Sequence, residues 1–145
     1  LDHFKRFNDN FGHDAGDFVL KEISALLKRS VGDDEIACRL GGEELAVLLP
    51  QSNMKQATEF ANTLCEAVRS LHLEHKGLSL GQLGVSIGVS TYPKPSSDME
   101  SLVKMADQAL YMAKDLGRSR VVNYGEYRTR KKPGLEVVEL EESPA

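Results

Sequence analysis

Two adjacent glutamates directly follow two adjacent glycines in the run Gly41-Gly42-Glu43-Glu44. Carboxylate oxygens are the ligands that Mg²⁺ prefers, and a Gly-Gly turn lets a ligand approach the backbone closely. One interpretation of this run is therefore a site for a metal-bound, negatively charged ligand. The other interpretation is a tight turn with two solvated carboxylates, and the run alone does not decide between them.

A second candidate site contains cations. Lys114 and Arg118 are four residues apart, which places both on one face of a predicted helix. Like charges at this spacing repel each other, and a bound triphosphate would reverse that repulsion. The alternative is a pair of ordinary cations near the carboxyl end of a helix, where the helix dipole favours them. Asp17 is a further candidate for ligand binding, and its alternative is a carboxylate in the first turn of a helix, where the dipole stabilises it.

Several other kinds of site have no support. The run 72–75 has two histidines and a glutamate but no further ligand nearby, so solvated loop residues are expected. His3 and His13 have no serine or cysteine partner in a recognisable motif. The sequence has no GxxxxGK[ST] or GxGxxG pattern, so neither a P-loop NTPase nor a Rossmann enzyme is indicated. Cys38 and Cys65 are far apart and are expected to be buried free thiols.

The elements that must position these residues follow from the apolar pattern. Helical spacing predicts helices over 3–11, 15–30 and 54–71, and a fourth from a capping box at Ser97 and Glu100 to about residue 116, followed by Gly117. Asp2 and Asp14 are the expected N-caps of the first two helices.

Alternating apolar residues predict the strands. The runs 36–40 and 45–49 flank Gly41-Gly42 and form a hairpin. The run 83–91 has one face of glycines and serines, small enough for a helix to pack closely, and 120–124 is a final edge strand. Residues 72–82 are ambiguous between a short strand and a loop. The expected class is α/β, with a central, mostly antiparallel sheet flanked by helices.

The length of 145 residues suits one domain with its own core, and 41% hydrophobic and 28% charged residues argue against global disorder. The net charge of −4 provides no strong attraction to nucleic acid or membrane lipid, so local groups and a metal must hold any phosphate. The start at Leu1, without Met or a signal peptide pattern, indicates a cut inside a larger protein. We expect a domain over 1–124 and a flexible charged tail over 125–145, with a linker into a further domain as the alternative.

The motifs occur in a specific order along the chain: Asp2-His3-Phe4-Lys5-Arg6-Phe7-Asn8-Asp9, Gly12-His13, Gly16-Asp17, Arg39-Leu40-Gly41-Gly42-Glu43-Glu44-Leu45, Ser86-Ile87-Gly88-Val89 and Ala109-Leu110-Tyr111-x-Ala113-Lys114-x-x-Gly117-Arg118. This ordered set resembles the GGDEF family, the catalytic domain of bacterial diguanylate cyclases, over residues 1–124. Glu43 is a common variant at the third position of the signature, and Leu45 replaces the usual phenylalanine.

The resemblance implies a fold similar to the catalytic core of nucleotide cyclases and the polymerase palm. It also implies a role for each matching residue. Asn8 and Asp17 would read guanine, and the amides around His3, Phe4 and Lys5 would meet the phosphates with Lys114 and Arg118. Gly41 and Gly42 would let GTP lie over the hairpin. Glu43 and the Leu1 backbone carbonyl would bind metal, and Glu44 would bind metal or activate the attacking 3′-hydroxyl.

The implied reaction condenses two GTP molecules into cyclic di-GMP and releases pyrophosphate, with Mg²⁺ or Mn²⁺. Each domain would hold one GTP, so the competent unit would be a homodimer. An upstream sensor or receiver domain is expected in a cytoplasmic parent protein, and a membrane anchor elsewhere in that parent is compatible with this. No nucleic acid partner and no membrane contact by this domain are expected.

The chain departs from the family pattern in two places. The family has a central strand that ends in a metal-binding Asp immediately before the Leu1 position, and the sequence does not contain it. The family's inhibitory product site is an Arg-x-x-Asp, whereas the matching run Gly32-Asp33-Asp34-Glu35 has no arginine. We therefore expect no product inhibition through that site.

Two functional classes remain open. The first is an active diguanylate cyclase, which the intact Gly41–Glu44 run, Asn8, Asp17 and Lys114 favour. The second is a degenerate GGDEF domain that binds GTP and regulates an attached domain without turnover, which a native loss of the Asp before Leu1 would favour. A purely structural interaction domain is disfavoured because it needs none of these polar residues.

Overall fold

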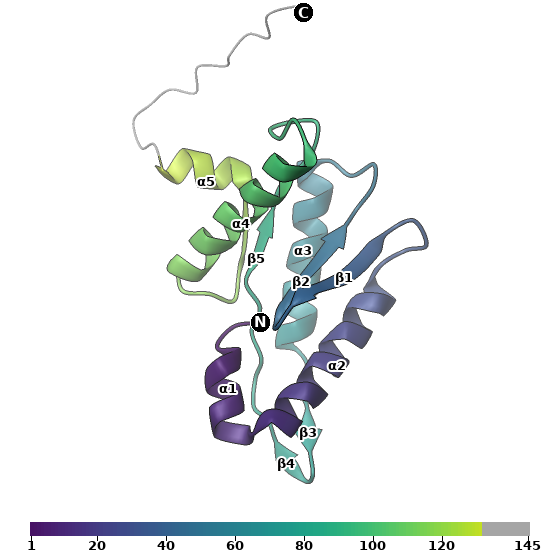
Figure 1. Cartoon of the computed structure of the whole chain (residues 1–145), viewed down its shortest axis with the longest axis vertical. Coiled ribbons are helices and arrows are strands. Elements are labelled where there is room, and N and C mark those ends of the chain that lie inside the picture. Colours follow the sequence, from purple (N-terminus) through teal and green to yellow (C-terminus); the bar gives the residue numbers. More distant parts are fainter. Residues whose placement is uncertain (132–145) are drawn as a thin grey trace, which may run out of the picture.

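The computed structural model describes residues 1–131 and contains helices that alternate with short strands. The helices are α1 (Phe4–Phe11), α2 (His13–Ser30), α3 (Met54–Arg69), α4 (Met99–Asp115) and α5 (Tyr124–Lys131). The strands are β1 (Ile36–Gly41), β2 (Glu44–Leu48), β3 (Glu74–His75), β4 (Leu78–Ser79), β5 (Ile87–Val89) and β6 (Val121–Asn123). Figure 1 shows this arrangement, and the expected α/β class is confirmed.

Helices α1 and α2 are separated only by Gly12, whose φ of 87° lets the chain turn sharply between them. Gly12 is the N-cap of α2, so the prediction that Asp14 caps this helix was wrong, and α2 starts two residues earlier than expected. The N-cap of α1 is His3, without a side-chain hydrogen bond. Asp2 therefore does not cap α1, because its carboxylate bonds to Ser86 and Ser119 instead.

The hairpin predicted around Gly41-Gly42 is confirmed as the antiparallel pair β1–β2. Ile36 lies opposite Leu48 and Arg39 opposite Leu45. The register shifts between Arg39 and Gly41, so that Gly41 lies opposite Glu44. This irregularity places Glu43 and Glu44 at the end of the hairpin, where the short turn fixes the position of their backbone.

The predicted central sheet is divided into three two-stranded pairs in the described part of the chain. The pairs β1–β2 and β3–β4 are antiparallel, and β5–β6 is parallel. The strand expected over 83–91 is reduced to Ile87–Val89. Its preceding residues bond elsewhere, because the Gly84 carbonyl accepts from the Asp2 amide and the Val85 carbonyl from the Cys65 thiol. The ambiguous run 72–82 contains the small β3–β4 hairpin.

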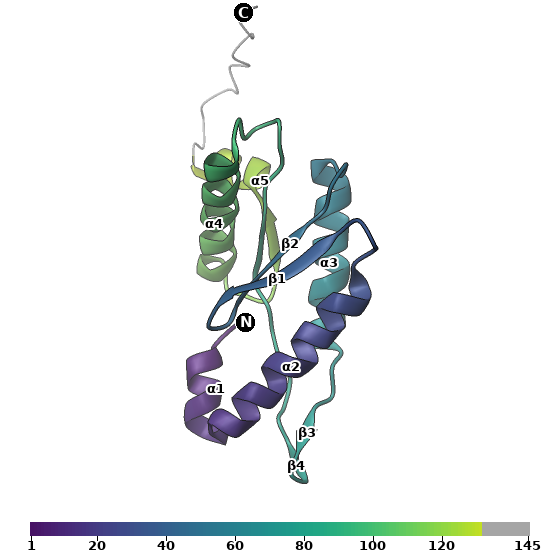
Figure 2. The ribbon, with the colours of Figure 1, turned by 45° about the vertical axis from the view of Figure 1, so that its right-hand side comes forward.

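Most of the buried core residues fall into two clusters, and a smaller third cluster joins α3 to β5. One cluster joins α2, α3 and the segments beside them through Val19, Ile23, Leu64, Val68 and Leu80. A second cluster joins α4 to β6 through Ala109, Ala113 and Val122. Figure 2 shows β5 between α4 on one side and α3 on the other. The buried Cys65 fits its prediction, but Cys38 is exposed, because it lies on the hairpin at the edge of this core.

The N-cap of helix α4 lies one residue later than the predicted capping box places it. The N-cap is Asp98, whose Oδ1 accepts from the Ser101 amide at 2.7 Å, and no cap is formed by Ser97 with Glu100. Asp98 and Ser101 bond reciprocally, which satisfies amides that have no partner inside the helix. The helix ends at Asp115, and Gly117 follows with a φ of 113°, as expected for a residue beyond a helix end.

Helix α5 corrects the expectation that a flexible tail starts at residue 125. Its Tyr127 packs against the α4–β6 cluster, and the rings of Tyr124 and Tyr127 stack with centroids 5.4 Å apart. The Glu126 amide donates to Asn123 Oδ1 at 3.0 Å, which helps to start the helix. The sequence did not predict this helix, because its two tyrosines alone form no clear helical periodicity. The rest of the predicted tail, 132–145, lies outside the described residues. Among the helices of 1–131, none has the length and apolar character needed to cross a membrane.

Candidate active site

The turn of the β1–β2 hairpin is open to an approaching ligand. Gly42 has a φ of 51°, a left-handed conformation that suits glycine, and no atom lies within 4 Å of where a Cβ of Gly41 or Gly42 would stand. Arg39 stabilises the turn, because its Nε donates to the Gly42 carbonyl at 2.9 Å. Glu44 is exposed and Glu43 is half-buried. No sequence pattern singles out Arg39 for this role.

The first residues of the chain lie against this turn. The Leu1 nitrogen donates to the Glu43 carbonyl at 3.2 Å, across 42 positions of sequence. The charged groups of Asp2, Glu43, Glu44 and Lys114 all act on the Leu1 nitrogen electrostatically. These four charged groups therefore lie around Leu1. The start of the chain lies at the centre of the molecule (Figure 1).

The predicted phosphate-binding turn is the amino end of α1. His3 has a φ of 55°, and its carbonyl accepts the Phe7 amide as the helix begins. The amides of Phe4 and Lys5 belong to the first turn, where backbone N–H groups have no partner within the helix. Such amides and the positive end of the helix dipole suit a phosphate. The Phe4 ring packs toward the core, and Lys5 is exposed.

Lys114 and Arg118 do not share a helix face. Lys114 is exposed in the last turn of α4, but the helix ends at Asp115 and Arg118 lies in the turn that follows. The chain reverses there because Gly117 and Arg118 have φ values of 113° and 65°, and the Arg118 amide donates back to the Ala113 carbonyl. The i, i+4 argument was therefore wrong, although both cations remain at the same end of α4.

Asn8 and Asp17, the predicted guanine-reading pair, come from two different helices. A Cβ at Gly16 would stand 1.8 Å from Asn8 Oδ1, so the Asn8 amide occupies the space beside Gly16. Asp17 follows Gly16 directly and is exposed. Asn8 Oδ1 is buried, and no donor in the described residues bonds to it. Because Asn8 Oδ1 is buried against Gly16, the exposed Asp17 carboxylate is the group that can accept from a ligand that presents N–H groups, as a guanine edge does.

Sequence reasoning missed a polar network between these parts. Asp2 Oδ1 accepts from Ser86 Oγ at 2.6 Å, and Asp2 Oδ2 accepts from the Ser119 amide at 2.9 Å. Arg69 donates to the Ser119 carbonyl at 2.9 Å and to its hydroxyl at 3.2 Å. The partners of Asp2 lie 84 and 117 positions away, so no local pattern could have indicated them.

The donors near the hairpin fit a divalent metal that is bound together with phosphates. Within 1–131, no three His, Cys, Asp or Glu side chains are grouped so that they could hold a metal by themselves. Glu43, Glu44 and the Leu1 carbonyl offer oxygen atoms only. Mg²⁺ is commonly held by one or two carboxylates and completed by substrate phosphates and water, so this donor set suits it.

Comparison with known proteins decides the family. Residues 1–120 match the family described as diguanylate cyclase, GGDEF domain. The chain belongs to the GGDEF family. This GGDEF domain is 39% identical over 121 residues to the uncharacterised protein YhcK of Bacillus subtilis, covering 83% of the chain and 34% of YhcK. It is 38% identical over 124 residues to the diguanylate cyclase VdcA of Vibrio cholerae, covering 84% of the chain and 36% of VdcA.

A solved structure agrees with this assignment. The GGDEF domain of DgcB from Caulobacter crescentus, in complex with c-di-GMP, superposes with a TM-score of 0.78 at 30% sequence identity. The match covers 86% of this chain and 73% of that one. GGDEF diguanylate cyclases generally depend on a divalent metal ion, in agreement with the oxygen donors at the hairpin. The chain spans only about a third of the length of the two curated relatives above.

Proposed function

We propose that this GGDEF domain is the catalytic domain of a diguanylate cyclase, which joins two GTP molecules into cyclic di-GMP and releases pyrophosphate. The observation that carries the proposal is the position of Leu1 against Glu43, because it brings the amino end of α1 to the hairpin glutamates. The candidate groups for the base, the phosphates and the metal then lie along one path from Asn8 to Glu43.

The proposed path for GTP begins at the guanine. Asp17 would accept from guanine N1–H and the 2-amino group, and the Asn8 amide would bond to the base beside it. The phosphates would then follow α1 toward its amino end, where the amides of Phe4 and Lys5 receive them. Lys114 and Arg118 would neutralise the far end of the triphosphate from the carboxyl end of α4.

In the proposed reaction, the 3′-oxygen of one GTP bonds to the α-phosphorus of the other. The bond from that phosphorus to the oxygen of the β-phosphate breaks, pyrophosphate leaves with the electron pair, and the proton of the attacking 3′-hydroxyl passes to Glu44 or to water. Glu43 would hold Mg²⁺ or Mn²⁺ together with the Leu1 carbonyl, and Glu44 would bind metal or orient the 3′-hydroxyl. When bound, the metal neutralises charge on the phosphates and lowers the pKa of the attacking hydroxyl.

A homodimer is part of this proposal. Each domain would bind one GTP, and each of two successive bond formations needs the 3′-hydroxyl of the opposite nucleotide. Turnover per molecule should therefore rise with protein concentration until the dimer is saturated. Full turnover by a strictly monomeric protein would contradict the proposal. The proposal also includes a cytoplasmic location and an attached sensor or receiver domain. That domain would control how two GGDEF domains meet.

A second candidate is a GGDEF domain that binds GTP and regulates an attached domain without turnover. It would be favoured if the protein natively lacks the metal-binding Asp that the family carries immediately before the Leu1 position. A single experiment separates the two candidates. The full-length protein is incubated with GTP and Mg²⁺, and the products are identified by mass. Cyclic di-GMP with pyrophosphate would establish the cyclase, and bound but unchanged GTP would establish the regulatory module.

A further inference from the structure

The carboxylate of Asp2 connects three segments that are distant in sequence. One oxygen accepts from the Ser86 hydroxyl just before β5, and the other accepts from the Ser119 amide after α4. The Asp2 amide also donates to the Gly84 carbonyl at 3.0 Å. Hydrogen bonds to an ionised acceptor are about twice as strong as neutral ones. Asp2 is therefore a bridge between the amino end of α1 and the turn after α4.

The turn held by this bridge is strained. Arg118 and Ser119 have φ values of 65° and 47°, which residues other than glycine rarely adopt. Such conformations persist only where surrounding contacts determine them. Here the contacts are on Ser119, because its amide is bound by Asp2 and its carbonyl and hydroxyl by Arg69.

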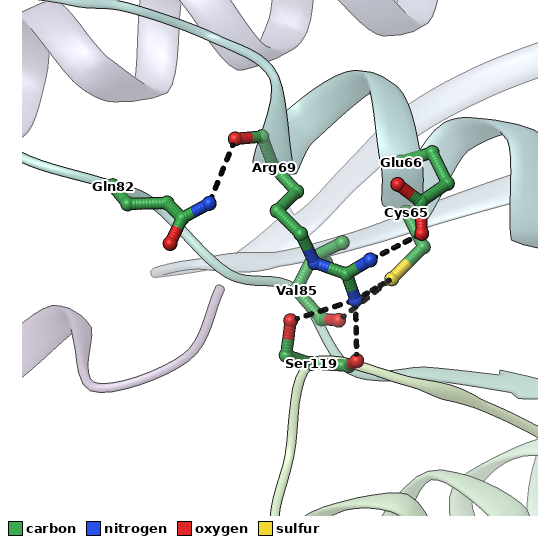
Figure 3. A network of polar contacts seen from close by, with 6 residues as sticks. All are labelled: Cys65, Glu66, Arg69, Gln82, Val85 and Ser119. Atoms are coloured by element: carbon green, nitrogen blue, oxygen red, sulfur yellow. Dashed lines mark hydrogen bonds and ion pairs between the residues drawn. The ribbon is translucent and has the colours of Figure 1, made fainter.

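Arg69 provides the opposite side of the bridge from α3. Figure 3 shows its guanidinium between Ser119 and the Cys65–Glu66 turn of its own helix. Gln82 donates to the Arg69 carbonyl at 3.3 Å, which ties the end of α3 to the segment before β5. Asp2 and Arg69 thus hold one residue, Ser119, from two directions, and Arg118 is its direct neighbour.

We infer that Asp2 is a positioning residue that sets the distance between the two phosphate-binding parts of the site. The inference rests on the proposed function, since those parts are the α1 turn at His3–Lys5 and the cations at Lys114 and Arg118. Asp2 adjoins the first part in sequence and bonds to the second through Ser119. Asp2 does not need to touch the nucleotide for this role. It acts by keeping Arg118 within reach of the phosphates.

The test compares a ligand that has phosphates with one that lacks them. GTP and guanosine are titrated by NMR into the full-length protein, into Asp2→Ala and into Asp2→Asn. We expect Asp2→Ala to weaken GTP binding by about tenfold or more, as losing charge-assisted hydrogen bonds does. Guanosine affinity should change by less than about twofold, because the Asn8 and Asp17 end is independent of the bridge. Asp2→Asn, which keeps one acceptor, should give an intermediate loss.

A rescue separates positioning from general destabilisation. Asparagine adopts left-handed φ values more readily than serine, so Ser119→Asn should restore part of the GTP affinity lost in Asp2→Ala. If Asp2→Ala fails to fold, Gly84→Ala provides a second perturbation, because its Cβ would stand 3.2 Å from Asp2 Oδ2. It should give the same selective loss of GTP affinity, with Gly32→Ala as the control.

The outcomes separate this inference from the proposed function. An unchanged GTP affinity in Asp2→Ala, or equal losses for GTP and guanosine, would overturn the inference whether or not the wild-type protein makes cyclic di-GMP. A selective loss of GTP affinity in a protein that makes no cyclic di-GMP would uphold the inference and reject the cyclase. A wild-type protein that binds GTP no better than guanosine would overturn both.

Discussion

Gly88 of β5 lies directly against the backbone of Ala106 in α4, so close that a Cβ on Gly88 would stand 2.1 Å from the Ala106 carbonyl oxygen. Leu110 adds a second backbone contact at 2.4 Å from the same point. Two residues after Gly88, the Ser90 hydroxyl donates to the Leu102 carbonyl at 2.6 Å. The small face predicted for this strand is therefore used for close helix packing, which fixes α4 and the cations at its carboxyl end.

Gly88→Ala should destabilise the domain severely. The added methyl meets main-chain atoms that cannot move without shifting α4, and overpacking of this kind costs about 3 kcal/mol or more. The free energy of unfolding is measured by urea denaturation. Gly32→Ala is the matched control, because its Cβ would meet only the carboxyl group of Glu35, with the nearest atom at 3.7 Å. Equal stability of the two variants would contradict the packing described for β5 and α4.

Gly16→Ala should impair recognition of the base while leaving the hairpin intact. Its methyl would stand 1.8 Å from Asn8 Oδ1, so the Asn8 amide must move from its present position. We expect GTP affinity to fall by about tenfold, the size of one lost hydrogen-bonding contact to a base, with little change for ATP. Binding of both nucleotides is measured by calorimetry. A parallel loss for GTP and ATP would indicate general damage and would count against guanine reading at Asn8.

The two cysteines should differ strongly in reactivity. Burial raises the pKa of the Cys65 thiol, with a smaller opposing effect from Arg69, so little of it is the reactive thiolate at pH 8. Cys38 is exposed. Iodoacetamide should modify one site quickly in the native protein and the second only after unfolding, which intact mass spectrometry measures. Two modifications at similar rates under native conditions would show that Cys65 is not protected.

Features that depend on residues close together in the sequence were predictable. The apolar spacing around Val19 and Ile23 identified α2, and Gly41-Gly42 between alternating strands identified the hairpin, because both patterns depend on near neighbours. The glycine face that contains Gly88 predicted close packing by a helix. The ordered motifs placed the chain in its family, as residues 1–120 confirm.

Features that depend on distant partners were not predictable. Asp2 was expected to cap α1, but tertiary contacts with Ser86 and Ser119 outweigh a local cap. The i, i+4 spacing of Lys114 and Arg118 gave the wrong geometry, because Gly117 ends the helix between them. Helix α5 was missed because Tyr127 finds its partners on α4 and β6, which no periodicity within 124–131 reveals.

In the proposed function, the hairpin glutamates catalyse the condensation of GTP. The most direct test measures cyclic di-GMP formation with saturating GTP and Mg²⁺ by the full-length protein and by Glu43→Gln, Glu44→Gln and the control Glu59→Gln. Glu59 is an exposed glutamate on α3, away from the turn. We predict a loss of at least about a hundredfold in each hairpin variant, as expected when a group that stabilises transition-state charge is removed, and wild-type rates in the control. Hairpin variants that retain wild-type rates would contradict the account.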